Sequence, residues 1–456
     1  MRLRRKVLGT AAFVLVLLSG CAAVDNFSSR ALTYNRQAAT IQEQALLLNV
    51  MRAAYRAPLQ FTAFTQITGQ AAVAGTAAFS LPFNPSPPSF PHADVASPSA
   101  TLSGTEAFTV ANLDTQEFYQ GILSPVPLST IDHYLEQGYP ETVVLTLMVG
   151  RIDFDIRGGA SGSIANNFYH SGYRHFESAI LGLVDLGLRT ETVTDVESIG
   201  PPLDPDQIGE VRALGPLIGP DTELRPFTPA TDPDLTLAER TALAARHAGE
   251  YFRLQTTTKA SRFCFDSRRR HLHAASLALV AAGILGPGET VTGIAPGLIS
   301  TAEQCGAPGY LRRRAEARSG YAAPDRRLEL EVADQGGAAR RISLGLIFTV
   351  RSAEGIIYHL GEIARGELEI GAHSALPPPV VMTALGEDRL FEVRHGCAEA
   401  PREISIAYGG GRYCIGVDPS GHDRSAEVMQ IVLQLLALEN SARNLPAAGV
   451  ISILGP

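Results

Sequence analysis

Two histidines, His271 and His273, stand one residue apart and are the first candidates for chemistry in this sequence. On a strand, side chains two residues apart share a face, and two imidazoles placed in this way can hold a metal ion. The apolar stretch over 271–285 predicts a helix instead, and on a helix such side chains diverge. We therefore expect no metal site here and interpret the pair as the polar start of a helix.

A nucleophile with a histidine and a carboxylate would indicate a hydrolase, and Asp132 and His133 supply two of these three types. The serine of such a site stands on a sharp turn, as in G-x-S-x-G, and the sequence contains no such pentapeptide. The stretch over 158–162, Gly-Gly-Ala-Ser-Gly, comes nearest but misses the pattern by one position. We expect a flexible turn there and predict no catalytic residue.

Two further patterns also favour structural explanations. The run from Gly409 to Arg412 lacks the Lys-Ser/Thr of a phosphate-binding loop and precedes a strand-like segment, so a hairpin turn is expected. Asp153 and Asp155 alternate on a strand-like segment, and no carboxylate partner stands at a readable spacing. We expect solvated charges at a sheet edge rather than an acid–base pair.

The N-terminus contains the most specific motif of the chain. A basic stretch over 2–6 and an apolar run over 7–18 lead to Leu18-Ser19-Gly20-Cys21, and the run is too short for a membrane span of about 20 residues. The tetrapeptide resembles the lipobox of bacterial lipoproteins. The resemblance implies that residues 1–20 are removed as a signal peptide, that the Cys21 thiol carries a diacylglycerol with palmitate-type chains, and that Ala22 directs the protein to the outer membrane. The alternative is an ordinary signal peptide with a chance cysteine.

The remaining cysteines are Cys264, Cys305, Cys397 and Cys414, an even number that favours disulfides in an oxidising compartment. Four cysteines allow three connectivities, and we prefer the two local pairs, Cys264–Cys305 and Cys397–Cys414. The second pair flanks a predicted hairpin over 403–417. A zinc site would require clustered ligands, and no C-x-x-C occurs, so neither a metal nor another cofactor is expected.

The elements that would position these residues mix helices with antiparallel hairpins, without a strand–helix–strand rhythm, which predicts an α+β fold. Helices are expected at 31–57, 129–137 with Ser129 as N-cap, around 176–186, and at 235–248, 271–285, 352–366 and 425–440. Strands are expected at 59–68, 71–79, 142–149, 151–156, 251–256, 327–332, 341–350 and 450–454.

Two subdomains are expected, an N-terminal half over 21–195 and a C-terminal half over 235–456. The segment between them, 196–234, carries eight prolines and predicts a linker or a long irregular excursion. The Pro- and Ser-rich segment over 82–103 predicts an extended loop or a disordered insertion.

The first predicted helix carries a polar stripe of Asn49, Arg52 and Tyr55, spaced three residues apart. One interpretation is a recognition surface for a partner near the membrane. The other, which we prefer, is a hydrogen-bonded seam where this helix packs on the second half of the chain. This helix and the segment after it are similar to uncharacterised proteobacterial lipoproteins, a resemblance that implies no activity.

The formal net charge is −8, and removal of residues 1–20, with four basic and no acidic side chains, takes it to −12. Such a chain is not expected to bind nucleic acid or to adsorb to anionic lipid by charge, so its membrane contact would be the acyl group. We predict a lipid-anchored outer-membrane protein with a periplasmic body, acting without catalysis as a scaffold or binding module for envelope partners. The alternatives are an envelope hydrolase with an unrecognised site and, disfavoured by the frequent Gly and Pro, a helical efflux channel.

Overall fold

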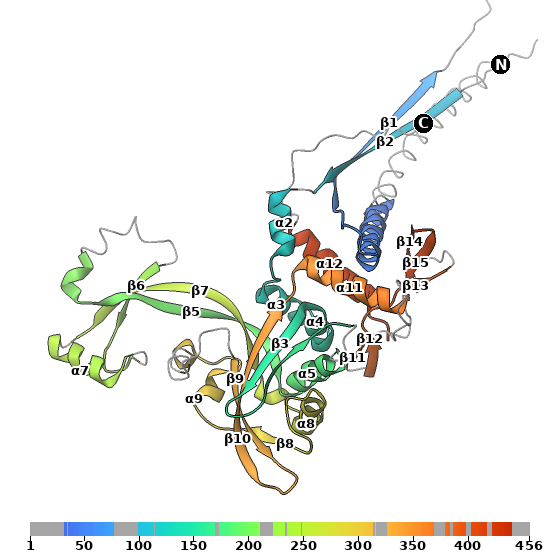
Figure 1. Ribbon diagram of the computed structural model, residues 1–456. Coiled ribbons are helices and arrows are strands. Elements are labelled where there is room, and N and C mark those ends of the chain that lie inside the picture. Colours follow the sequence, from blue (N-terminus) through green and yellow to red (C-terminus); the bar gives the residue numbers. More distant parts are fainter. Residues whose placement is uncertain are drawn as a thin grey trace, which may run out of the picture. The chain divides into compact units, whose positions relative to one another are not determined.

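The computed structural model describes residues 32–33, 35–76, 99–113, 115–168, 173–209, 222–232, 235–247, 249–312, 315, 326–368, 379–383, 386–397, 403–416 and 422–439. The chain divides into two compact units. The large unit combines residues 46–58 with 122–434, and the small unit combines 1–45, 59–121 and 435–456. Helices accompany antiparallel sheets, so the predicted α+β class is confirmed (Figure 1).

A five-stranded antiparallel sheet forms the centre of the large unit (Figure 1). Its strand order is β4 (Ser161–Ala165), β3 (Val149–Ile156), β10 (Ala339–Val350), β9 (Arg326–Ala333) and β8 (Thr290–Ile294). The predicted hairpin of β9 and β10 is confirmed, and Gly337 in its turn has a φ of 78°. Strands from both predicted halves of the chain share this sheet, because β10 pairs with β3. Alternate residues such as Ile152, Leu330 and Leu344 bury one face.

Helix α4 (Glu141–Met148) corrects the strand predicted over 142–149. Every residue from Thr142 to Met148 is buried, so no polar face gives the segment a helical period. Eight apolar and β-branched residues suit a buried strand equally well. Helix α4 packs on α5 (Tyr173–Asp185), which in turn packs on α8 (Leu272–Ala281), and these helices contact strands β3, β4 and β8.

Helix α3 (Leu128–Glu136) lies beside α4 and differs from the prediction at its first residue. Pro127 occupies the N-cap position, with no capping side chain, so the expectation of Ser129 as N-cap is wrong. Proline has no amide hydrogen to leave unpaired and its φ is already suited to a helix start. Gly138, with a φ of 89°, ends the helix as predicted.

Helix α11 (Ala353–Glu367) follows β10 and is confirmed in its start and its buried face. The Ser352 hydroxyl caps it by accepting a hydrogen bond from the Gly355 amide at 3.0 Å. Its apolar side chains Ile356, Ile357, Leu360 and Ile363 are fully buried. The N-terminal helix, residues 35–54, approaches it so closely that a Cβ at Gly361 would lie 2.5 Å from that of Ala53. Helix α12 (Ser425–Glu439) forms as expected.

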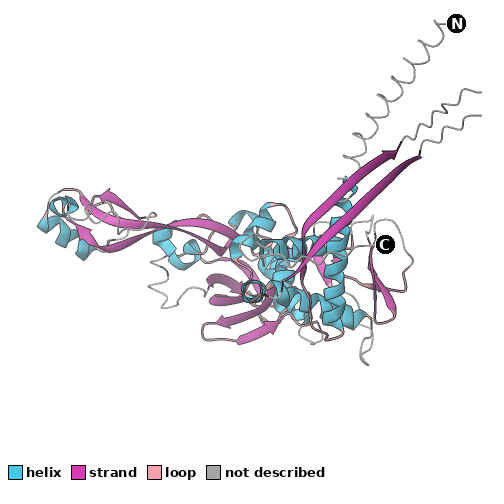
Figure 2. Ribbon diagram, turned by 90° about the horizontal axis from the view of Figure 1, so that it is seen from above, coloured by secondary structure: helices cyan, strands magenta, loops and turns pink. Residues whose placement is uncertain are grey.

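A three-stranded antiparallel arm extends from the large unit (Figure 2). It consists of β5 (Leu188–Leu203), β7 (Tyr251–Phe265) and β6 (Thr222–Phe227), with α7 (Leu237–Arg246) near its end. Parts of β5 and all of β6 fall inside 196–234, so the expectation of irregular structure is wrong for these residues. The prolines interrupt the pairing rather than exclude it, because the register of β5 shifts between Ile199 and Leu203.

The C-terminal part of the large unit contains two small antiparallel sheets. One pairs β11 (Val380–Thr383) with β12 (Gly386–Arg389). The other places β15 (Gly411–Ile415) between β13 (Arg394–His395) and β14 (Ile404–Tyr408), which confirms the hairpin turn predicted at Gly409 to Arg412. Gly409 and Gly410 have φ values of 56° and 83°, a conformation that favours glycine.

The small unit contains a long two-stranded ribbon and most of α2 (Gln116–Leu123). Strand β1 (Thr62–Thr76) pairs with β2 (Ser99–Asn112), so the two strands predicted over 59–79 are one, with a bulge at Phe64 and Gln66. Residues 99–103 are strand rather than loop, and the rest of the predicted loop lies outside the described residues. The signal peptide, Cys21 and the predicted strand over 450–454 also lie outside them. None of the described helices has the length and apolar character needed to cross a bilayer.

Candidate functional site

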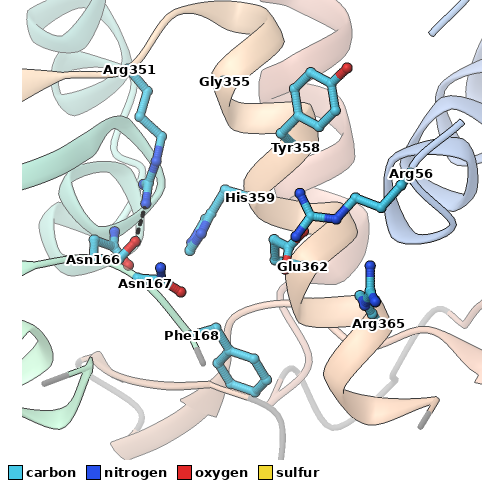
Figure 3. Close-up of a pocket in the computed structure, with 10 residues that line it drawn as sticks. All are labelled: Arg56, Asn166, Asn167, Phe168, Arg351, Gly355, Tyr358, His359, Glu362 and Arg365. Atoms are coloured by element: carbon cyan, nitrogen blue, oxygen red, sulfur yellow. Dashed lines mark hydrogen bonds and ion pairs between the residues drawn. The ribbon is translucent and has the colours of Figure 1, made fainter. Parts of the chain in front are cut away.

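The polar face of α11 lines a cleft of about 600 Å³ in the large unit, which we call the α11 cleft (Figure 3). Residues of α11 recur at helical spacing along it, and three other segments complete the walls. These segments are the end of the N-terminal helix, the stretch that follows β4 and the residue before Ser352. The lining residues are Arg56, Asn166, Asn167, Phe168, Arg351, Gly355, Tyr358, His359, Glu362 and Arg365.

Arg351 is a half-buried cation held by main-chain carbonyl groups. Its Nη1 donates to the carbonyl oxygens of Leu147 at 2.9 Å and Val149 at 3.0 Å, and its Nη2 donates to that of Asn166 at 2.7 Å. The negative end of the α4 dipole lies at these carbonyls, which favours a cation there. Burial lowers the pKa of the guanidinium to about 9, so it stays protonated at neutral pH. Arg351 therefore contributes a fixed positive charge to the cleft.

Two buried polar atoms of the cleft have no hydrogen-bond partner among the residues that the structure describes. His359 is 6% exposed and its Nε2 is unpartnered, as is the Asn166 Oδ1. The Asn166 amide is oriented by its Nδ2, which donates to the carbonyls of Thr146 at 2.7 Å and Val149 at 2.8 Å. Burial, followed by the charge of Arg351, holds the pKa of His359 well below its usual value, so the imidazole is neutral. Buried polar atoms rarely lack a partner, and these two offer hydrogen bonds to a bound group.

The opposite part of the cleft carries three charged side chains, those of Arg56, Glu362 and Arg365 (Figure 3). Arg56 forms an ion pair with Glu362, with 2.8 Å between Nη2 and Oε1. The Arg56 side chain is 64% exposed and that of Glu362 is 20% exposed. Arg365 forms no ion pair with any residue that the structure describes. The lining thus has three arginines and one carboxylate, with a neutral histidine between them.

The backbone of Arg56 adopts an unusual conformation at the end of the N-terminal helix. Its φ is 59°, the left-handed region that glycine normally occupies at this position. The Arg56 amide donates to the Ala53 carbonyl at 3.0 Å, and the Ala57 amide donates to the Arg52 carbonyl at 2.8 Å. This hydrogen-bond pattern is a Schellman motif, and Pro58 follows it. The motif fixes the direction from which the Arg56 side chain enters the cleft.

A second, smaller cavity of about 270 Å³ lies between α4, α5 and the β11–β12 hairpin. Glu177 lines it and accepts a hydrogen bond from the Val380 amide at 3.2 Å. Burial raises the pKa of Glu177 to about 7. The other lining side chains include apolar residues such as Ile180 and Val381. This cavity lacks the set of charged groups that distinguishes the α11 cleft.

The cysteine pairing predicted from the sequence is confirmed. Disulfides join Cys264 to Cys305 and Cys397 to Cys414. Glu191 lies within ligand distance of the first pair, but both sulfurs are already bonded to each other. This carboxylate instead forms an ion pair with Arg262, with 2.7 Å between Oε1 and Nε. We therefore interpret the disulfide and the neighbouring ion pair as structural cross-links rather than as metal ligands.

The other sequence candidates do not converge on the α11 cleft. His271 and His273 are exposed at the start of α8, as expected, and His271 is its N-cap. Asp132 is buried and accepts hydrogen bonds from Thr190 and Thr192 of β5, at 2.9 and 2.8 Å. It therefore ties α3 to the arm.

Two further expectations concern the segments on either side of β3. Asp153 and Asp155 are not edge charges, because β3 lies between β4 and β10. Both form ion pairs, Asp153 with Arg151 and Asp155 with Arg327. The stretch over 158–162 contains the turn that joins β3 to β4, as expected.

The stripe of Asn49, Arg52 and Tyr55 lies in the large unit, and its first residue is buried. Arg52 Nη1 donates to Asn49 Oδ1 at 3.4 Å, and the hydroxyl groups of Tyr55 and Tyr413 lie 2.6 Å apart. Tyr55 also contacts the ring of Tyr408. These contacts are of the kind that the packing interpretation expects, and the partner surface stays a prediction.

Sequence reasoning missed the polar face of α11. Tyr358, His359, Glu362 and Arg365 follow the same helical period as the buried apolar residues, on the other side of the helix. This spacing was readable in the sequence. Arg56 and Asn166 join the cleft only through tertiary contacts, for which the sequence contains no local signal.

Three comparisons with known proteins gave no match. The chain matches no protein-family model, no curated protein and no solved structure.

Proposed function

We propose that this chain is a lipid-anchored protein of the bacterial outer membrane whose large unit binds a small ligand in the α11 cleft. The lipobox-like stretch ending at Cys21 supports the anchor, and the two disulfides suit an oxidising compartment such as the periplasm. The observation that carries the binding function is the unpartnered Nε2 of His359, buried in a cleft of about 600 Å³.

The cleft favours binding over hydrolysis. Among the described residues, its lining contains no serine, threonine or cysteine, the hydroxyl and thiol side chains that most often attack an ester or amide. The Nε2 of His359, the atom that would activate a nucleophile, has no hydrogen-bond partner among the described residues. A binding module that presents or carries a ligand within the envelope agrees with these residues, and envelope proteins remain its proposed partners.

The anchor is tested by substitution at the proposed acylation site. Cys21→Ala should leave the protein in the soluble periplasmic or unprocessed fraction, whereas the wild-type chain should fractionate with the outer membrane. Ala22→Asp is the matched control, because it keeps the acylated cysteine but should move the protein to the inner membrane. Outer-membrane fractionation of Cys21→Ala would show that the lipid does not hold the protein.

The binding function is tested with a fluorescent reporter. The chain contains no tryptophan, so Tyr358→Trp places a single indole at the cleft wall. Soluble compounds of the cell envelope should change its emission, whereas an indole at Leu277, which is 62% exposed on α8, should not respond. Equal responses of the two reporters, or none from either across the compound set, would contradict ligand binding in this cleft.

A further inference from the structure

We propose that the α11 cleft takes a ligand with an anionic group, a carboxylate or a phosphate, which Arg56 and Arg365 bind, and that Glu362 competes with this group for Arg56. The inference rests on the proposed binding function. It adds the chemical class of the ligand and the competition between Glu362 and the ligand for Arg56. Three features of the cleft support it: its charge, the availability of its arginines and the position of its one carboxylate.

The cleft is positive within an acidic chain. Arg56, Arg351 and Arg365 face one carboxylate, that of Glu362, while the formal charge of the whole chain is −8. His359 is held neutral by burial and by Arg351, so it does not alter this balance near neutral pH. A concave surface with an excess of one charge raises the local concentration of ligands of the opposite charge.

The three arginines differ in what they can bind. Both terminal nitrogens of Arg351 already donate to main-chain carbonyls, so this residue supplies positive potential rather than a direct contact. Arg365 has no ion-pair partner among the described residues, and Arg56 has a single contact, to Glu362. A planar guanidinium that is free to donate two parallel hydrogen bonds is the usual recognition group for a carboxylate or a phosphate.

Glu362 occupies the position where the anionic group of a ligand would bind Arg56. Its carboxylate lies 2.8 Å from the Arg56 guanidinium, one turn of α11 away from Arg365 (Figure 3). An incoming anion must therefore replace Glu362 at Arg56 or share the guanidinium with it. Loss of the Glu362 charge removes this competitor and an electrostatic repulsion at the same time.

The inner wall suggests what the rest of the ligand contains. The unpartnered Nε2 of His359 and Oδ1 of Asn166 are both neutral and both buried. Figure 3 shows the His359 ring between Asn166 on one side and Arg56 and Arg365 on the other. A ligand that places its anion at the arginines can thus direct a neutral polar group, such as a hydroxyl or an amide, toward His359.

Calorimetric titration of the full chain tests the proposal. The probes are inorganic phosphate, citrate and, as a neutral comparison, glycerol; vesicles of phosphatidylglycerol in phosphatidylcholine distinguish a lipid headgroup from a free anion. We expect phosphate or citrate to bind and glycerol not to bind. Arg365→Gln should weaken anion binding by about tenfold, the loss of one charge-assisted contact. Arg268→Gln, at an exposed site outside the cleft, should leave it unchanged.

The Glu362→Gln variant tests whether Glu362 competes with the anionic ligand for Arg56 or instead helps to bind that ligand. We expect this variant to bind the same anion several-fold more tightly than the wild-type chain, because Arg56 is then free. Weaker binding by Glu362→Gln would overturn the competition, and equal binding by Arg365→Gln and Arg268→Gln would overturn the anionic ligand class. A neutral compound that changes the Tyr358→Trp emission, and does so regardless of Arg365→Gln, would overturn the ligand class but leave the binding function intact.

Discussion

At the scale of single residues, the conformation of Arg56 is the least expected feature of the α11 cleft. A non-glycine residue in the left-handed region is disfavoured by about 1–2 kcal/mol, because its Cβ crowds the following carbonyl. Glycine at this position would relieve the crowding but would remove the guanidinium from the cleft. Strain at a residue that also provides a charged group agrees with the anion-binding role that we propose for this side chain.

Paired substitutions at Arg56 measure this strain. Arg56→Gly and Arg56→Ala both lose the ion pair to Glu362, but only the alanine variant keeps a Cβ in the left-handed region. We expect the free energy of unfolding of Arg56→Gly to exceed that of Arg56→Ala by about 1 kcal/mol. Urea denaturation of both variants provides the comparison, and identical midpoints would show that the helix end relaxes without strain.

Glu367, near the end of α11, is expected to make the stability of the large unit depend on pH. Burial raises its pKa to about 8; the Val393 amide and Arg389 oppose this shift, and the charges of Glu392 and Asp423 add to it. The Glu367 Oε1 is buried and has no hydrogen-bond partner in the described part of the chain. Because the folded-state pKa lies above the unfolded value, the stabilisation is complete below about pH 4.5 and is lost as the pH rises toward 8.

Glu367→Gln should remove this pH dependence. The variant should gain stability relative to the wild-type chain between pH 5 and pH 8, by the order of a few kcal/mol, since each unit of pKa shift corresponds to about 1.4 kcal/mol. Urea denaturation at the two pH values tests this. Glu136→Gln, at an exposed position of α3, is the control and should follow the wild-type chain. A constant difference between Glu367→Gln and the wild-type chain at both pH values would contradict the shift.

The residues of the candidate site show what sequence reasoning can reach. The buried face of α11 was predicted from its period, and the period of the opposite face places Tyr358, His359 and Glu362 in line. The significance of that line depends on Arg56 and Asn166, which are far away in the sequence. Local pattern can thus identify a polar helix face but cannot show whether that face meets solvent or a cleft.

At the scale of elements, α4 and β6 were missed for different physical reasons. Helix α4 is buried on all sides, so its sequence has no alternation of apolar and polar residues to mark it as a helix. Strand β6 contains Pro226 and has no buried residue, which weakens the usual strand signals. Its position at the edge of the arm makes this proline acceptable, since an edge strand can leave an amide unpaired. The hairpins β9–β10 and β14–β15, whose turns contain consecutive glycines, were predicted correctly.

The two disulfides are expected to stabilise the large unit to different degrees. The bond between Cys264 and Cys305 closes a span of 41 residues, and that between Cys397 and Cys414 closes 17. In the chain-entropy description, the longer loop contributes about 4 kcal/mol and the shorter about 3 kcal/mol. Beside the first bond, Arg262 donates to the carbonyls of Ala302 and Gln304, at 2.9 and 2.7 Å.

Replacing each disulfide by two alanines tests this order. Cys264→Ala/Cys305→Ala should lower the free energy of unfolding more than Cys397→Ala/Cys414→Ala, as measured by urea denaturation under non-reducing conditions. The two double variants are matched controls for each other, because each replaces one fully buried cysteine and one partly exposed cysteine. The reverse order would show that local packing around the hairpin outweighs loop length.

At the scale of the whole molecule, the described elements do not follow the predicted halves of the chain. The central sheet takes β3 from one half and β10 from the other, while the segment between the halves contributes to an arm. Proline content predicted a linker or an irregular excursion over 196–234, whereas strands β5 and β6 pair with β7 in parts of this segment. Pairing between strands that lie far apart in sequence leaves no such local mark, and so the sharing of one sheet could not be predicted.

The outer part of the arm should be dispensable for the fold of the large unit. Its ion pair of Arg253 with Asp232 and its hydrogen bond from Tyr251 to the Leu243 carbonyl both stay within the arm. Replacing residues 198–255 by a short turn should therefore leave the unfolding midpoint of the rest of the chain nearly unchanged, with anion binding in the cleft retained. A large fall in the midpoint would show that the arm supports the core.

The pairing of β3 with β10 also bears on how the chain reaches its folded state. Ile156 pairs with Leu344, so the centre of the sheet joins segments about 190 residues apart. A chain that crosses the inner membrane from its N-terminus would expose β3 and the apolar α4 well before their partner arrives. Contacts of such long range form slowly and leave intermediates open to aggregation. If the protein is exported as we propose, its folding should accordingly depend on periplasmic chaperones that shield the first half until β10 emerges.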